Sequence, residues 1–529
     1  MIIAYDFSYR ALVLVLFQLL IPTNIRSHNM KSKKLFLHSF LLLFVFIFTN
    51  SYAQQDKIQK IDEFIKKAMT DWKMPGFSLA IVKNDSVIFA KGYGVKDIRK
   101  NEIVDENTLF VIASCSKAFT TALLATLVDA GKLKWDDPVT KYLPDFQMYD
   151  PWVTKEMMVR DLVTHRSGLA TFSGDFLWLS STYDQKEVIR RARFLKPTSS
   201  FRSRYGYQNI MFITAAEFIK AVTDTSWADY VRAHFLTPLG MNHTNTSYSL
   251  FNQDDNAAKA HYERNEEMKI YSDVQQDNAH GALGLNSSAI EMAQWIRLQL
   301  GKGTYNGHKI FSERQSQEMW SNQTVSGNGN YGLGWGINYR NGKKTLSHGG
   351  GMPGMISQVT IVPEEKFGFV LLSNLEVGMV GAVNNYIFDI MTNVEPKDYE
   401  KMTLEGYAKR QEAFDKEIKR REEIRAKDSK PSLPLEKYCG TYEDKMYGKA
   451  EVTLKNGKLF LQFVPSPTFR GELKHYQFDM FQIDWEDEFL TRGYLKFDMN
   501  FKGDVTQMTF EVPNSPDFIF TELLFEKIK

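Results

Sequence analysis

The sequence predicts a mixed α and β domain followed by a small all-β domain. Three observations carry this prediction. Helical and strand-like segments alternate up to about residue 395, a run rich in Lys, Arg and Glu fills 405–427, and short segments with alternating apolar residues fill the remainder. The 529 residues also exceed the size of one small domain, and the 43% hydrophobic content is that of a globular protein.

Residues 30–53 have the pattern of a secretory signal, and we expect residues 1–29 to be an upstream over-extension of the reading frame. Three lysines precede the apolar run 35–48, and small residues follow at the positions that a signal peptidase reads, with Ala53 last. The apolar run is shorter than the ~20 residues that a membrane span needs. We therefore expect a signal peptide that starts at Met30 and is cleaved after Ala53, no stable membrane span, and an exported product, periplasmic or secreted.

The first predicted domain spans 54–395. Apolar residues at helical spacing over 58–69 predict an opening helix, which a Pro-Gly pair ends. Next, 77–83 and 86–91 predict a β-hairpin around an Asn-Asp turn, and the segments within 360–372 predict a second pair of strands.

The charged run lies in a predicted helical linker, 396–432, which a Pro-containing segment ends. The last predicted domain, 433–529, has strand patterning throughout. Val452 and Leu454 alternate with polar residues before an Asn-Gly turn, and the alternation resumes over 459–463. This pattern predicts a small β-sandwich or β-barrel.

Charge and cysteine content exclude several classes of protein. The 65 Lys and Arg residues nearly balance the 63 Asp and Glu residues, which leaves no basic excess for a nucleic-acid partner. Two cysteines cannot form a disulfide framework, so a buried core must stabilise the fold.

The first motif that indicates chemistry is S-x-x-K, from Ser114 to Lys117. An apolar, strand-like run over 109–113 precedes it and the helix-forming stretch 118–130 follows, so we expect Ser114 at a helix N-terminus with Lys117 one turn further on the same face. A serine attacks only after a neighbour takes its proton, and a lysine whose pKa is lowered by burial can do so. Ser116 is a poorer candidate, because the residue three positions beyond it is a phenylalanine.

The second motif is Tyr207-Gln208-Asn209, which precedes the apolar helical stretch 210–222. A tyrosine beside cationic groups can act as a phenolate or a proton shuttle, and an asparagine amide can bond both a lysine and a substrate carbonyl. A rival Y-x-N begins at Tyr339, but it adjoins an Asn-Gly turn between predicted strands, which favours Tyr207.

The third motif is H-G-G-G, from His348 to Gly351. Glycines let the backbone approach a substrate closely, and a free N–H can face a developing oxyanion. Taken alone, the same segment is also compatible with an ordinary glycine-rich turn.

In this order, the three motifs resemble those of the serine β-lactamase and penicillin-binding-protein superfamily, and most of all class C β-lactamases, D-alanyl-D-alanine carboxypeptidases, D-aminopeptidases and related esterases. The segments 162–169, 235–241 and 331–335 are similar to the "LLTHxSGL", "PLGM" and "YGLGW" segments of that superfamily. The resemblance covers about 57–395, and the tail after 433 resembles a β-rich domain of unknown function often appended to such hydrolases. The resemblance implies an α+β fold, in which helices flank an antiparallel sheet and a helical lobe carries the second motif, followed by a barrel-like domain.

The resemblance also implies roles for the matching residues. Ser114 would be the acylated nucleophile, Lys117 its proton acceptor or relay, and Tyr207 the general base and leaving-group acid. Backbone N–H groups of Ser114 and Gly351 would form the oxyanion hole. The candidate site residues are Ser114, Lys117, Tyr207 and His348 for catalysis and Asn209, Gly350 and Gly351 for substrate binding.

His348 occupies the position where many β-lactamases carry the lysine of K-T-G. A histidine there is typical of the peptidase and esterase branches, and its ordinary pKa predicts a limb in the activity profile around pH 6–7. The resemblance therefore implies a serine hydrolase that cleaves amide or ester bonds through an acyl-enzyme, as a D-amino-acid peptidase or a carboxypeptidase or β-lactamase-related hydrolase. A small-ester carboxylesterase and a non-catalytic penicillin-binding sensor remain the alternatives.

Other enzyme classes lack their motifs in this sequence. An α/β-hydrolase needs a G-x-S-x-G elbow, and a zinc hydrolase needs H-E-x-x-H or clustered cysteines; the chain contains none of these. Cys115, inside the first motif, is expected to be a small core residue rather than a nucleophile. We thus expect a small peptide, β-lactam or ester as substrate, with no metal and no cofactor.

Overall fold

The structure is a computed structural model that describes residues 54–272, 275–327, 329–512 and 519–528, so the predicted signal segment 1–53 lies outside the described residues. The chain divides into two compact units, Met1–Asp62 and Glu63–Lys529. Of the first unit, residues 54–62 are described, and they are helical. No helix in the described part of the chain is long and apolar enough to cross a membrane.

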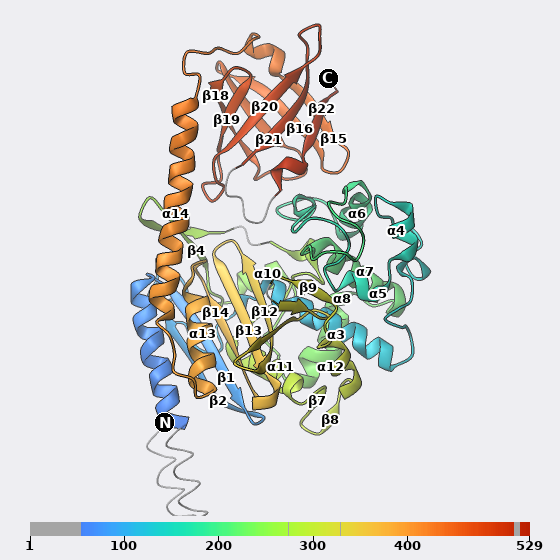
Figure 1. Ribbon diagram of the computed structural model, residues 1–529, viewed down its shortest axis with the longest axis vertical. Coiled ribbons are helices and arrows are strands. Elements are labelled where there is room, and N and C mark those ends of the chain that lie inside the picture. Colours follow the sequence, from blue (N-terminus) through green and yellow to red (C-terminus); the bar gives the residue numbers. More distant parts are fainter. Residues whose placement is uncertain (1–53, 273–274, 328, 513–518, 529) are drawn as a thin grey trace, which may run out of the picture. The chain divides into compact units, whose positions relative to one another are not determined.

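The core of the second unit is an antiparallel sheet of eight strands (Figure 1). The predicted hairpin is confirmed as β1 and β2, and the predicted second pair as β13 and β14, which are longer than the sequence indicated. In spatial order the strands are β2 (Ser86–Gly94), β1 (Gly76–Lys83), β14 (Phe367–Ser373), β13 (Met355–Val362), β12 (Lys343–Met352), β11 (Gly336–Arg340), β10 (Gly329–Tyr331) and β9 (Thr324–Ser326).

Helices cover β14, which explains why this strand is an almost unbroken apolar run. Every residue of β14 is buried, because α11 (Ala289–Leu300) packs on β1 and β14 and α13 (Met379–Met391) packs on β13 and β14. A strand buried on both faces has no solvent side on which polar residues would alternate.

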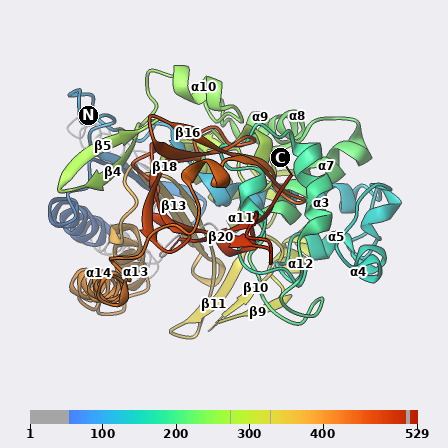
Figure 2. The same ribbon diagram turned by 90° about the horizontal axis from the view of Figure 1, so that it is seen from above.

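A helical lobe adjoins the sheet, and both views place α3 (Ser116–Asp129), α5 (Val159–Leu162) and α7 (Asn209–Thr223) together in it (Figures 1 and 2). Residues 116–127 of α3 are all buried, since neighbours surround this helix; the ring of Phe119 stacks on that of Trp295 at 3.7 Å. This helix is the one predicted over 118–130, and it starts two residues earlier than predicted, at Ser116. The strand expected over 109–113 is only Phe110–Val111 (β3), and it pairs with β6 (Asn286–Ser287) outside the main sheet.

The charged run forms α14 (Tyr399–Ile424), whose single buried residue is Glu400. A closed eight-stranded barrel follows, and it decides between the predicted sandwich and barrel. The predicted Asn-Gly turn joins β16 to β17, with positive φ at both Asn456 and Gly457, as a type I′ turn requires. The barrel strands are β15 (Gly440–Asp444), β16 (Gly448–Lys455), β17 (Lys458–Phe463), β18 (Arg470–Gln477), β19 (Met480–Trp485), β20 (Gly493–Met499), β21 (Val505–Glu511) and β22 (Leu524–Lys527).

Candidate active site

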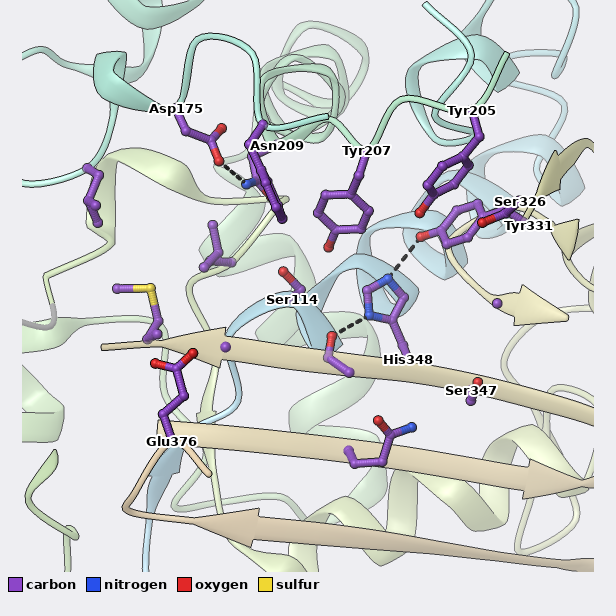
Figure 3. A pocket seen from close by; sticks show the side chains of 18 of the residues that line it. Ser114, Asp175, Tyr205, Tyr207, Asn209, Ser326, Tyr331, Ser347, His348 and Glu376 are labelled. Carbon is purple, nitrogen blue, oxygen red and sulfur yellow. Dashed lines mark hydrogen bonds between the residues drawn. The ribbon is translucent and has the colours of Figure 1, made fainter. Parts of the chain in front are cut away.

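A cavity of about 440 Å³ lies where the helical lobe meets the end of β12 (Figure 3), a size suited to a small-molecule or short-peptide ligand. The structure brings the sequence-predicted residues together there. Ser114, Tyr207, Asn209, His348 and Gly351 line the cavity. Lys117 lies behind Ser114 and is fully buried.

Ser114 sits in a 3-10 turn, Ala113–Cys115, that leads directly into α3. Its side chain is 9% exposed and faces the cavity. Gly350 does not line the cavity but backs this turn: a Cβ on it would lie 2.2 Å from the carbonyl oxygen of Ile112 and 3.0 Å from the backbone nitrogen of Ser114. Only glycine lets β12 approach the serine turn this closely.

Lys117 directs its amine at the serine. Its Nζ lies 3.0 Å from Ser114 Oγ, 2.7 Å from Asn209 Oδ1 and 3.0 Å from the carbonyl oxygen of Ala282. Burial lowers the pKa of Lys117 to about 7, although the negative charge of Asp175 acts in the opposite direction. A large fraction of this amine is therefore neutral at neutral pH and has a lone pair available.

Tyr207 precedes α7 and is held by His165, one of the residues of the 162–169 segment. His165 has a φ of 56°, its Nδ1 accepts a hydrogen bond from the backbone N–H of Gln208 at 3.0 Å, and its ring lies 4.2 Å from that of Tyr207. Burial raises the pKa of Tyr207 well above its ordinary value, opposed by a hydrogen bond with Ser114. The phenol thus stays protonated at neutral pH, which contradicts a phenolate base in the resting enzyme and suits a proton donor.

His348 is buried and neutral. Its Nδ1 donates to the carbonyl oxygen of Gly349 at 2.7 Å, because a carbonyl can only accept, and its Nε2 then accepts from the Tyr331 hydroxyl at 2.9 Å. Burial, followed by the charge of Lys117, lowers the pKa of His348 to about 3. The expected titration of His348 at pH 6–7 is therefore wrong, and the group that titrates near neutrality is Lys117.

Two rival residues lie outside this arrangement. Tyr339, in the competing Y-x-N, is 63% exposed on β11 and does not line the cavity. Cys115 is buried, with Sγ 3.2 Å from the carbonyl oxygen of His348, and burial raises the pKa of its thiol to about 11. A thiol with so high a pKa is a poor nucleophile at neutral pH.

Sequence reasoning missed several residues that line the same cavity. Tyr331 belongs to the "YGLGW"-like segment and could have been singled out from it. The others stand in no motif and reach the cavity from loops, from sheet strands and, for Phe489, from the barrel. They include Asp175, Tyr205, Ser347, Glu376 and Phe489. Within the described ranges, no group of three or more His, Cys, Asp or Glu side chains is placed to hold a metal ion.

Comparison with known families agrees with this geometry. Residues 61–390, which include all the candidate site residues, match the family described as beta-lactamase. The chain belongs to the beta-lactamase family. Residues 424–527 of this beta-lactamase-family protein match a domain of unknown function, DUF3471, and they contain the barrel. The predicted superfamily and the predicted fold class are both confirmed.

Named relatives are distant. The unguisins hydrolase ungD′ of Aspergillus campestris is 26% identical over 416 residues, 73% of this chain and 75% of that protein. Protein flp of Staphylococcus aureus is 26% identical over 326 residues, 60% of this chain and 64% of its own length. These relatives include a hydrolase.

Among solved structures, the octameric penicillin-binding protein homologue from Pyrococcus abyssi is similar with a TM-score of 0.59 and 20% identity, covering 89% of this chain and all of that one. EstCE1, a hydrolase with promiscuous acyltransferase activity, is similar with a TM-score of 0.56 and 18% identity, covering 64% of this chain and 98% of that one. Both likenesses show a shared fold.

Proposed function

We propose that this protein is a serine hydrolase that cleaves an amide or ester bond through an acyl-enzyme on Ser114. The observation that carries the proposal is the contact between Ser114 and Lys117: a fully buried amine with a pKa of about 7 lies 3.0 Å from the serine oxygen at the head of a cavity. A lysine in this state is a general base suited to neutral pH.

The hydrogen bonds of Lys117 support one direction of proton transfer when the amine is neutral. A neutral amine has two N–H donors and one lone pair, and the oxygens of Asn209 and Ala282 can only accept from it. The lone pair therefore remains for the hydroxyl proton of Ser114. As Oγ forms its bond to the substrate carbonyl carbon, that proton moves to Lys117 Nζ and the carbonyl electrons move onto oxygen.

Tyr207 supplies the proton that the leaving group needs. Its ring lies 4.8 Å from Lys117 Nζ and its hydroxyl points toward Ser114 (Figure 3), so the phenol can reach the leaving amine or alkoxide. When the carbon–leaving-group bond breaks, Tyr207 donates its proton and the Lys117 ammonium can restore it. In the second half-reaction water attacks the acyl-enzyme and the same proton transfers run in reverse. Tyr207 and Lys117 accept the water proton, and Ser114 regains its proton when its bond to the acyl group breaks. We assign the oxyanion hole to the N–H groups of Ser114 and Gly351, as the family resemblance implies.

The charges around the cavity favour some substrates over others. Glu376 supplies a carboxylate, the buried Asp175 adds negative charge behind Asn209, His348 is neutral, and none of the described residues that line the cavity is Lys or Arg. A free carboxylate on the substrate would meet like charge, whereas a free amine would meet opposite charge. This favours an aminopeptidase-type D-amino-acid substrate over a carboxypeptidase substrate, and a small neutral ester is the second candidate because it needs no charged partner.

The test combines active-site labelling with a substrate panel, using the chain from residue 54 onward. We expect a fluorophosphonate probe to label Ser114, and D-alanine p-nitroanilide or p-nitrophenyl acetate to be cleaved at least about tenfold more efficiently than N-acetyl-D-alanyl-D-alanine or nitrocefin. A chain that no probe labels at Ser114 would contradict the proposal. Labelling without turnover of any panel member would favour the penicillin-binding sensor.

A further inference from the structure

We propose that the C-terminal barrel is part of the catalytic apparatus: it holds the turn 173–178, and Asp175 in that turn is a positioning residue that orients Asn209 toward Lys117. This inference rests on the proposed acyl transfer at Ser114. Neither Asp175 nor the barrel belongs to any of the three sequence motifs.

Asp175 reaches the base through one intermediate side chain. Its Oδ2 accepts from Asn209 Nδ2 at 2.7 Å, and Asn209 Oδ1 lies 2.7 Å from Lys117 Nζ (Figure 3 shows the Asp175–Asn209 bond). Asp175 Oδ1 accepts from Trp178 Nε1 at 2.9 Å. The carboxylate is 2% exposed, so water cannot readily replace either bond.

The two N–H groups that donate to Asp175 require a carboxylate at this position. Each oxygen receives an N–H, and an ionised carboxylate can accept at both positions whereas an amide can accept at only one. With an asparagine at position 175, the new NH2 group would face either Trp178 N–H or Asn209 NH2. If the side-chain amide of Asn209 flips to avoid this clash, its NH2 group faces Lys117 Nζ. The amine lone pair then accepts from Asn209 and is no longer available to the Ser114 hydroxyl.

The barrel fixes the turn that carries Asp175. The backbone N–H of Gly174 donates to Glu522 Oε2 at 3.0 Å, and Gly174 has a φ of 80°. Phe176 is 1% exposed and packs edge-on against the barrel rings of Phe520 at 4.7 Å and Phe469 at 5.6 Å. The residues on both sides of Asp175 are therefore seated on the barrel.

Contacts a few residues further along hold the same loop. The backbone N–H of Thr182 donates to the carbonyl oxygen of Pro465 at 2.8 Å, and the Tyr183 hydroxyl donates to the carbonyl oxygen of Tyr447 at 2.8 Å. Displacements of about 1 Å in a catalytic arrangement can reduce rates by about 100-fold. A loop that depends on the barrel in this way makes the barrel relevant to turnover.

The first experiment is a double-mutant cycle of Asp175→Asn and Trp178→Phe in the full chain. Asp175→Asn is expected to lower kcat by about 100-fold and, because the negative charge near Lys117 is lost, to move the acid limb of the pH profile to lower pH. Trp178→Phe removes the indole N–H that competes with Asn209 for an acceptor at position 175. In the double variant, the amide oxygen of the new asparagine at position 175 can therefore accept from Asn209 Nδ2. We expect the double variant to recover about tenfold in kcat over Asp175→Asn, with Trp178→Phe alone as its reference.

A merely structural role of Asp175 gives a different result. If the role is only structural, Asp175→Asn lowers the fraction of chains labelled at Ser114. The chains that are labelled keep the wild-type acid limb of the pH profile, and kcat does not recover in the double variant. That outcome, or wild-type kcat in Asp175→Asn, would overturn the positioning role. Failure of the wild-type chain to be labelled at Ser114 would instead refute the proposed function itself.

The second experiment tests the barrel. Glu522→Ala removes the acceptor of the Gly174 N–H and is expected to lower kcat about five- to tenfold, whereas Glu522→Gln keeps an acceptor and should stay within about twofold of wild type. Because Glu522 acts through Asp175, Glu522→Ala should add little to Asp175→Asn in the double variant. Additive losses, or a fully active Glu522→Ala whose thermal unfolding matches that of Glu522→Gln, would overturn the role of the barrel.

Discussion

Ser114→Ala is expected to abolish turnover, with a loss of kcat on the order of 10⁶-fold, because it removes the hydroxyl that lies 3.0 Å from the Lys117 amine. The change removes one oxygen from a side chain at the cavity surface, so the fold should be unaffected. Steady-state kinetics on the best substrate of the panel measure the loss, and intact-mass spectrometry shows whether the adduct disappears.

Ser116→Ala is the matched control for this variant. Ser116 lies two residues further on, is fully buried, and its Oγ accepts from the backbone N–H of Leu285 at 3.2 Å. We expect this control to keep its adduct at Ser114 and to lose only about 1 kcal/mol of stability with the hydrogen bond. Adduct formation in Ser114→Ala at the wild-type rate would end the assignment of the nucleophile.

Lys117→Met is expected to reduce kcat by about 10³- to 10⁴-fold, which is the size of a lost general base. Methionine fills a similar volume without an amine, so Ser114 keeps its place but loses its proton acceptor. Activity is measured across pH 5–9 for the wild type and for Lys117→Met. A variant that retains the wild-type rate and its pH dependence would show that the serine is activated by another group.

The same variant has a signature in stability. The pKa of Lys117 is about 7 in the folded chain and 10.5 as its ordinary value, so between these two the unfolded chain binds more protons than the folded one. The free energy of unfolding of the wild type should therefore rise relative to Lys117→Met from pH 7 to about 10.5 and show no such trend below pH 7. Denaturant unfolding at several pH values measures this difference.

The sequence predicted the parts of the site that stand in short motifs. Ser114 and Lys117 lie one turn apart, and Tyr207 lies just before the helix that Asn209 begins, so their local placement followed from spacing. Their meeting depended on the family resemblance, because the residues lie on segments about 90 positions apart in the chain.

Properties that arise from packing could not be predicted in this way. A histidine has an ordinary pKa near neutrality, but His348 lies against Tyr331 from β10 in a buried site, and its pKa falls to about 3. Asp175 stands in a single 3-10 turn, Asp175–Leu177, with no sequence motif, and its relevance appears only when Asn209 is seen between it and Lys117. Strand patterning predicted the barrel but not that Phe489 would reach the cavity.

The pH dependence of Ser114 labelling tests the central claim most directly, since it reports the base without requiring the natural substrate. Phosphonylation joins Ser114 Oγ to phosphorus as fluoride leaves, and it needs the serine proton to be removed. We predict a rate that rises with pH as one proton is lost, with a midpoint near pH 7, and then stays level to pH 9, while Lys117→Met loses this midpoint. A rate that is the same at every pH from 5 to 9 would contradict the assignment of Lys117 as the base.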